Sequence, residues 1–149
     1  MEQKSVTLAQ LLPLILDAFA NGQTAVLPVT GVSMRPTLLP GDSVTLAAAD
    51  PAAIRRGDVV LYRRDSHAFV LHRVVKAHKD TLTLCGDGQV ALEKGLPRTA
   101  VIGKAIAGTH SGTPFGEDYL RRTARTRLFS RPFRAAATAI HRMKQQKLS

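Results

Sequence analysis

The chain has 149 residues, which suits one domain with a closed core, and its five Phe, two Tyr and no Trp leave aliphatic side chains to fill that core. One cysteine, Cys85, excludes an internal disulfide, so folding needs no oxidising compartment and we expect a cytoplasmic protein. The formal net charge is +10, and residues 117–149 hold nine Lys and Arg against two Asp and Glu. The basic character is therefore concentrated in the C-terminal part.

The N-terminal residues 1–23 are predicted to form an amphipathic helix that ends at Asn21-Gly22. Pro13 falls on the solvent side of this helix, where a kink is tolerable. The uncharged run from Ser5 to Leu16 has 12 residues, fewer than the roughly 20 that a membrane-spanning helix needs. No other segment has the composition of a membrane span, and no secretory signal is visible.

From residue 24 to residue 108 the pattern changes to short β-type runs separated by turn signals such as Pro40-Gly41-Asp42 and Gly86-Asp87-Gly88. Six strands are predicted, at 24–29, 43–46, 58–62, 69–76, 81–84 and 101–107. This spacing indicates a mainly β domain with an antiparallel, barrel-like or sandwich sheet. Residues 110–116 are predicted to be a loop.

Residues 109–149 are predicted to be a basic helical tail. Glu117 and Asp118 suit a helix N-terminus, and Pro132 divides the tail into two pieces. In the second piece apolar residues line one face and basic residues surround them, which suits an anionic membrane surface. The alternative is a basic face that is simply solvated.

The octapeptide Gly31–Leu38, GVSMRPTL, contains the most informative serine of the chain. A serine hydroxyl becomes a nucleophile only with a base within hydrogen-bond reach and donors for the developing oxyanion. Gly31 would let a substrate approach Ser33 closely, and Met34 follows the serine as a supporting residue. An isolated string of this kind is also compatible with an ordinary polar loop.

His72 is the candidate base, since neutral imidazole accepts a proton near pH 7. Strand alternation places it on one face with Val70 and Val74, a setting that also suits a core histidine. Asp87 lies in a Gly-Asp-Gly turn and could orient the imidazole, as could Glu93, or Asp87 could make only turn hydrogen bonds. No metal-ligand or phosphate-loop spacing is present, so no metal or cofactor is expected.

Together these blocks resemble the type I signal peptidase family of serine endopeptidases. The segments that match it, in the order of that family, are GVSMRPTL (31–38), PGD (40–42), RGDVVLY (56–62), LHRVV (71–75), CGDG (85–88) and VIGK (101–104). The resemblance implies a coiled antiparallel sheet, or partly open barrel, with Ser33 as the nucleophile. Most bacterial members have a lysine base where this chain has His72, so the resemblance is to the branch that uses histidine. By position, the resemblance also implies that Asp87 is the acidic residue that this branch uses, and more weakly that Glu93 is a second one.

The chain departs from that family in three ways. It lacks a predicted membrane anchor, it lacks the large inserted β domain of some members, and Gly31 stands where many members have a hydroxyl that helps the oxyanion. We therefore expect a compact endopeptidase, cytoplasmic or peripheral at the inner face of the membrane. It would cut an extended peptide or precursor protein, as in signal peptide processing, and residues 117–149 would contact anionic lipid.

Two other functions remain open. The first is a DNA-linked regulator that resembles self-cleaving repressors, which the basic tail favours. Against it, residues 1–23 are too few for a DNA-binding domain, and the Ala107-Gly108 bond lies downstream of Ser33, whereas those repressors cut upstream. We therefore do not expect a nucleic-acid partner. The second is a non-catalytic peptide-binding module, which the presence of Ser33, His72 and Asp87 together argues against.

Overall fold

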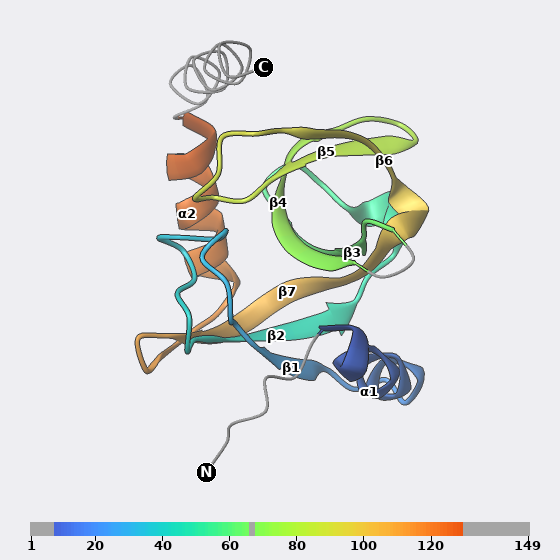
Figure 1. Ribbon diagram of the computed structural model, residues 1–149, viewed down its shortest axis with the longest axis vertical. Coiled ribbons are helices and arrows are strands. Elements are labelled where there is room, and N and C mark those ends of the chain that lie inside the picture. Colours follow the sequence, from blue (N-terminus) through green and yellow to red (C-terminus); the bar gives the residue numbers. More distant parts are fainter. Residues whose placement is uncertain (1–7, 66–67, 130–149) are drawn as a thin grey trace, which may run out of the picture.

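The structure is a computed structural model that describes residues 8–65 and 68–129. It contains eight strands in one open antiparallel sheet and two α-helices, so the predicted mainly β fold is confirmed (Figure 1). The strands are β1 (Ala25–Pro28), β2 (Ser43–Ala48), β3 (Val59–Arg63), β4 (Phe69–Ala77), β5 (Thr81–Cys85), β6 (Glu93–Pro97), β7 (Val101–His110) and β8 (Thr113–Phe115). The sheet order is β1-β2-β7-β3-β4-β5-β6, and β8 pairs with β7.

The helices α1 (Leu8–Ala20) and α2 (Glu117–Phe129) lie at different ends of the sheet (Figure 1). The helix predicted within residues 1–23 is present as α1, with Pro13 inside it and exposed. Its Ile15 is buried, and the Phe19 ring packs against Gly103 of β7. In the described ranges, neither helix is long and apolar enough to cross a membrane.

All six predicted strands are present, with small shifts at their ends, and two further strands were not predicted. β6 contains Gly95 and Pro97, which indicated turns, and most of it is solvent-facing. β8 forms a two-residue hairpin with β7 in which Ser111 and Gly112 both have positive φ, at 50° and 81°. Such a turn matches the twist of an antiparallel pair. The loop predicted for 110–116 is therefore mostly a hairpin.

The core has two parts, which lie on opposite faces of the curled sheet. One contains Ile15, Met34, Leu38 and other side chains from β1, β2 and β7. The other contains Val60, Tyr62, Val74 and side chains of β5 and β6. Because β3 and β4 contribute alternate residues to the two parts, these two strands separate one part of the core from the other.

The second helical piece predicted after Pro132 lies outside the described residues. The first piece is present as α2, which begins at Glu117 as expected and has Asp118 in its first turn. Anionic side chains there stabilise the positive end of the helix dipole. In Figure 1, α2 stands beside the loop that connects β1 to β2, and the Tyr119 hydroxyl of α2 contacts Thr37 of this loop.

Candidate active site

Ser33 lies in the loop between β1 and β2, which we call the serine loop (residues 29–42). Reciprocal backbone hydrogen bonds close this loop at its base, from Val29 N to Asp42 O and from Gly41 N to Val29 O, at 2.9 Å each. Met34 and Leu38 are buried in the core and anchor the loop, and the Arg35–Pro36 peptide bond is cis. The backbone hydrogen bonds and the two buried side chains hold the loop in place and leave Ser33 half-buried.

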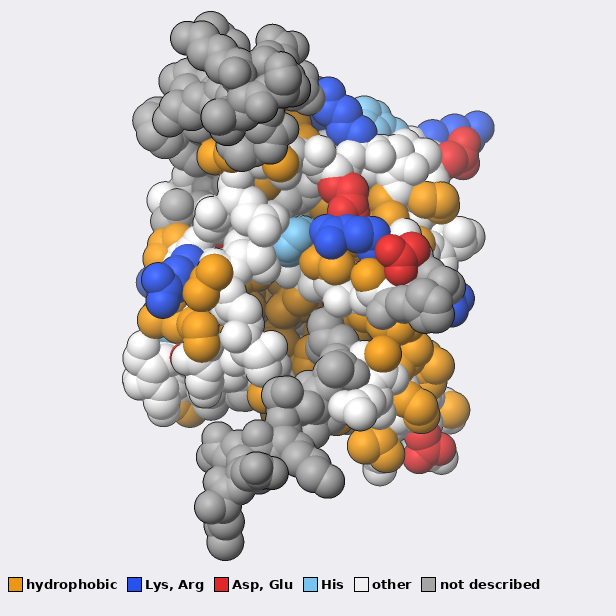
Figure 2. Space-filling view, viewed as in Figure 1, with side chains coloured by type: hydrophobic (Ala, Val, Ile, Leu, Met, Phe, Trp, Pro, Cys, Tyr) orange, Lys and Arg blue, Asp and Glu red, His pale blue; other side chains and the backbone are white. Residues whose placement is uncertain are grey.

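A cavity of about 200 Å³ opens beside Ser33. It is lined by Leu27, Pro28, Val29, Thr30, Gly31, Ser33, Met34, Phe69, Val70 and Leu71. On the face shown in Figure 2, a hollow with a hydrophobic floor opens beside a histidine and a group of acidic and basic side chains. Ligand-binding pockets are typically apolar with a few polar groups, so this cavity is a candidate binding site beside Ser33.

Two sheet edges border this cavity. β1 is the first strand in the sheet order and pairs with β2 along one side only. β4 pairs with β5 through Arg73 to Ala77, whereas its residues 69–72 pair with β3 alone within the described part of the chain. Free strand edges offer backbone donors and acceptors to an added strand. An extended peptide could therefore hydrogen-bond on either side of Ser33.

The Gly86-Asp87-Gly88 turn packs directly against the serine loop. Gly88 N donates to the Ser33 carbonyl at 2.9 Å. A β-carbon at Gly86 would lie 2.3 Å from that same carbonyl oxygen, a distance that no side chain could occupy. The close approach of these two backbones therefore requires glycine at position 86.

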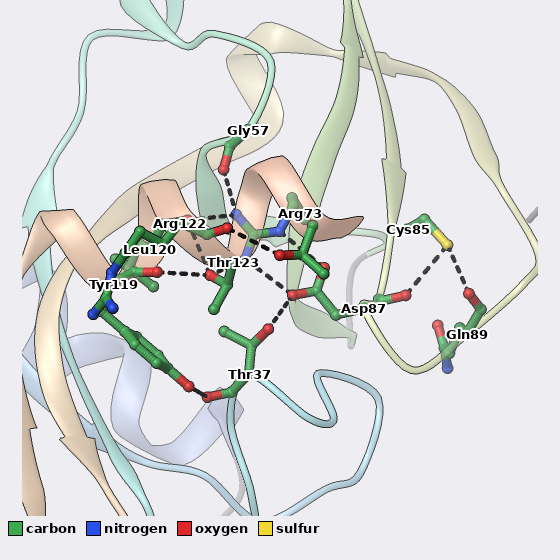
Figure 3. Close-up of polar contacts among 12 residues, drawn as sticks. Thr37, Gly57, Arg73, Cys85, Asp87, Gln89, Tyr119, Leu120, Arg122 and Thr123 are labelled. Carbon is green, nitrogen blue, oxygen red and sulfur yellow. Dashed lines mark hydrogen bonds and ion pairs between the residues drawn. The ribbon is translucent and has the colours of Figure 1, made fainter. Parts of the chain in front are cut away.

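Asp87 is buried in this turn, and its carboxylate binds Arg73 and Thr37 (Figure 3). Arg73 Nε donates to Oδ1 and Arg73 Nη2 donates to Oδ2, both at 2.9 Å, and the Thr37 hydroxyl donates to Oδ2 at 2.5 Å. Within the described residues, no hydrogen bond joins Asp87 to His72. The carboxylate that we placed beside the imidazole instead joins the serine loop to β4.

Arg73 is fully buried and uses all of its donors. Besides Asp87, it donates to Gly57 O, Leu120 O and the Thr123 hydroxyl, at 2.7, 3.2 and 3.0 Å (Figure 3). Two of these acceptors belong to α2, and the Tyr119 hydroxyl of the same helix donates to Thr37 O at 2.6 Å. The helix α2 therefore supports the serine loop through buried polar contacts.

His72 lies on the other face of β4 and is 4% exposed. It is opposite Val60 in the β3–β4 register, and Tyr62 is opposite Val70, so these four side chains share one face. Its Nδ1 lies 3.2 Å from the Tyr62 hydroxyl. Burial, followed by the positive charge of Arg64, lowers the pKa of His72 from 6.5 to about 4. The imidazole is thus neutral at pH 7, the form that can accept a proton.

Glu93, at the start of β6, is the carboxylate connected to His72. The Tyr62 hydroxyl, which is 3.2 Å from His72, donates to Glu93 Oε1 at 3.3 Å. Arg64 Nε donates to the same carboxylate oxygen at 2.7 Å and its Nη2 donates to the Tyr62 oxygen at 3.4 Å. The sequence had indicated Glu93 but neither Tyr62 nor Arg64, because residues at 62, 64 and 93 converge only when β3 and β6 are folded.

The structure therefore brings Ser33, His72, Asp87 and Glu93 to one region but divides them into two groups. Ser33 and Asp87 meet through the serine loop, whereas His72 and Glu93 meet through Tyr62. The Ser33 hydroxyl and the imidazole are not hydrogen-bonded to each other in the described structure. Val70 is close to both: it lines the cavity beside Ser33, and its side chain is on the same face of β4 as His72.

Gly31 and Met34 both line the cavity beside Ser33. A β-carbon at Gly31 would meet no atom within 4 Å, so the space over this residue is open. Met34, the residue after the serine, is 3% exposed and belongs to the core, so its side chain anchors the serine loop at this point. Across the described ranges, no three His, Cys, Asp or Glu side chains are grouped closely enough to hold a metal ion.

Comparison with protein families matches residues 2–106, more than half of the chain, to the Peptidase S24-like family. The chain belongs to this family. Peptidase S24-like proteins are serine peptidases of the superfamily that includes self-cleaving repressors and type I signal peptidases. No curated protein matches the chain. The S24-like match ends at Ile106 within β7, so the α2 residues that support Arg73 lie beyond it.

Proposed function

We propose that this S24-like protein is a signal peptidase-like endopeptidase that cleaves a peptide or precursor protein in trans by a Ser/His mechanism. The observation that carries the proposal is the position of Ser33 in an apolar cavity between two free strand edges, those of β1 and of residues 69–72 of β4. A substrate strand that pairs with these edges would present its carbonyl carbon to the serine. The open space over Gly31 would leave room for its backbone.

In the proposed reaction the Ser33 oxygen attacks the scissile carbonyl carbon while His72 takes the hydroxyl proton. The peptide carbonyl becomes an oxyanion, which backbone donors of the serine loop, starting with the Ser33 amide, would stabilise. His72 then gives its proton to the leaving amine, and a water molecule repeats the sequence to release the acyl group. A small shift of the serine loop or substrate binding must bring Ser33 to the imidazole, since catalytic hydrogen bonds often form only in the substrate complex.

Asp87 has a positioning role in this proposal. Its contacts with Thr37 and Arg73 fix the serine loop against β4, so its removal would displace Ser33. The connection from Glu93 to His72 supports assigning the orientation of the imidazole to that residue instead. Asp87 would thus position Ser33, and Glu93 would position His72.

Cleavage in trans is supported by the position of Ala107-Gly108, which has the residue types that self-cleaving repressors cut but lies downstream of Ser33 and inside the sheet. Ala107 pairs with Thr45 of β2, and Gly108 pairs with Val44 on one side and Phe115 of β8 on the other. This bond could reach Ser33 only if the middle of the sheet came apart. The DNA-linked, self-cleaving alternative is therefore the weaker proposal.

The proposal is tested with a fluorophosphonate probe that labels activated serines, followed by mapping of the labelled peptide. We expect wild type to be labelled at Ser33, Ser33→Ala to lose the label, and His72→Gln to be labelled far more slowly. Ser43→Ala is the matched control, because the Ser43 hydroxyl in β2 hydrogen-bonds Thr109 of β7 and Ser43 does not line the cavity. Equal labelling of Ser33→Ala and wild type would exclude Ser33 as the nucleophile.

We also propose that the basic C-terminal part holds the enzyme at an anionic lipid surface. Basic residues of α2, of β7 and of the turn before β3 line one pocket of about 400 Å³. They are Arg55, Arg56, Lys104, Arg121 and Arg125, and the acidic residues Asp58 and Glu117 line it as well. Each basic residue near an anionic membrane contributes about 1 kcal/mol.

Full-length protein should pellet with phosphatidylserine vesicles and not with phosphatidylcholine vesicles, and a chain ending at Phe129 should pellet less. Equal pelleting of both chains would remove the assigned role of residues 130–149.

A further inference from the structure

The hydroxyl of Tyr62 lies between the two groups that a catalytic histidine needs, the imidazole and a carboxylate. It is 3.2 Å from His72 Nδ1 and 3.3 Å from Glu93 Oε1. Tyr62 is 0% exposed, so no solvent competes for these contacts. The polar end of a buried tyrosine is normally hydrogen-bonded, and here its partners are all protein groups.

The direction of these hydrogen bonds follows from the partners. A phenol has one proton to donate, and Arg64 Nη2 can only donate to the Tyr62 oxygen. The Glu93 carboxylate can only accept, and two oxygens 3.3 Å apart without a proton between them would repel each other. The Tyr62 proton therefore points to Glu93. His72 Nδ1 must then carry a proton and donate it to the Tyr62 oxygen.

We infer that Tyr62 is a positioning residue of the Ser/His site, which holds His72 in the tautomer with a proton on Nδ1 and leaves Nε2 as the basic nitrogen. The inference rests on the proposed function for its catalytic meaning, while the tautomer itself is a property of the folded protein. Within the described residues, Nε2 makes no hydrogen bond. It is thus the nitrogen available to the serine or to a substrate.

Burial, with the negative charge of Glu93 as the second cause, raises the pKa of Tyr62 far above its usual value, so the phenol is protonated at neutral pH. The charged and titratable groups that act on His72 are Arg64 beside β3, Glu93 on β6 and Asp87 after β5, besides Tyr62 itself. Of these, only Tyr62 contacts the imidazole nitrogen. Glu93 would therefore act on His72 through the Tyr62 hydroxyl that lies between them.

The tautomer is measured by ¹⁵N NMR of the imidazole rings in full-length protein at pH 7, with His72→Gln used to assign the resonance. We expect a proton on Nδ1 in wild type and a shift toward the Nε2 proton in Tyr62→Phe, which removes the acceptor. The other tyrosine, Tyr119, contacts Thr37 O and not His72, so Tyr119→Phe should leave the His72 tautomer unchanged. Glu93→Ala is the second variant, should Tyr62→Phe fail to fold. It frees the phenol to donate to Nδ1 and should move the proton to Nε2.

Probe labelling of Ser33 provides the second readout. Tyr62→Phe should slow labelling by about tenfold to a hundredfold, part of the 10²–10⁴ that general base catalysis contributes. A wild-type ring with its proton on Nε2, or a tautomer that does not change in either variant, would overturn the inference. If the tautomer behaves as expected but wild-type Ser33 is never labelled, the inference stands and the proposed function fails.

Discussion

Both carboxylate oxygens of Asp87 accept a hydrogen bond from the guanidinium of Arg73, at 2.9 Å each, and neither side chain is exposed to solvent. Arg73 follows His72 directly, yet alternation along β4 places the two side chains on opposite faces. One face holds the ion pair that fixes the serine loop (Figure 3), and the other holds the imidazole. Two adjacent residues thus connect β4 to both parts of the site.

Breaking this ion pair should cost much more stability than breaking an exposed one. Asp87→Asn leaves the Arg73 charge buried without a counter-charge, which costs about 3–5 kcal/mol. Glu117→Gln makes the same acid-to-amide change in the exposed Arg121–Glu117 pair and should cost less than about 1 kcal/mol. Urea unfolding of both variants measures the difference, and similar losses would contradict the assigned role of the buried pair.

Gly86→Ala should disturb Ser33 more directly than any other glycine substitution in the turn. The new β-carbon would lie 2.3 Å from the Ser33 carbonyl oxygen, so one of the two backbones must move. We expect a loss of about 1–3 kcal/mol, as for other overpacked sites, and slower labelling of Ser33. Gly31→Ala is the control for stability, since its β-carbon meets nothing within 4 Å, and it should unfold within about 0.5 kcal/mol of wild type. Fast labelling in folded Gly86→Ala would show that the turn does not position the serine.

Activity should persist well below the ordinary titration range of histidine. Burial and then the Arg64 charge lower the pKa of His72 to about 4, so its neutral, basic form dominates above that pH. The rate of Ser33 labelling should therefore fall with an apparent pKa near 4 as the pH is lowered, in a pH-jump assay that keeps exposure to acid short. A midpoint at pH 6.5 would indicate an imidazole exposed to water, contrary to the structure.

The same shift makes His72 a source of pH-dependent stability. Because its folded pKa lies below the unfolded value of 6.5, the contribution is fully present above pH 6.5 and is lost as the pH falls from 6.5 to 4. We expect the free energy of unfolding to fall less steeply over this window in His72→Gln than in wild type. Parallel curves from urea titrations at several pH values would contradict the burial of a neutral imidazole.

Removing α2 should damage the site, although the family match ends before it. A chain ending at Gly116 loses Leu120 O and the Thr123 hydroxyl, which accept from buried Arg73, and the Tyr119 hydroxyl, which binds Thr37 O. We expect a large loss of stability and of Ser33 labelling. A chain ending at Phe129 keeps these contacts and is the matched control. If the shorter chain were as stable and as reactive, α2 would be dispensable to the site.

The sequence predicted the elements that have a periodic apolar pattern and missed those that have none. The strand at 69–77 could be predicted because Val and Leu recur along it. The strand at 93–97 could not, since it is an edge strand with Gly95 and Pro97 and forms only because β5 offers its backbone hydrogen bonds. The sequence also predicted that residues 24–108 and residues 109–149 form separate units. The contacts of Tyr119 and Thr123 show that the two ranges share buried polar groups.

The sequence named Ser33, His72, Asp87 and Glu93 as candidates, but it indicated neither Tyr62, Arg64 nor Arg73, and it did not predict how these residues are grouped. By itself the sequence determined the fold class and the short blocks around Ser33, His72, Asp87 and Glu93, because apolar periodicity and turn residues are local properties. Only the tertiary structure decided that Asp87 binds Arg73 while Glu93 reaches His72 through Tyr62. The physical reason is that strand register and twist set which side chains meet across a sheet, and both arise from contacts between residues far apart in the chain.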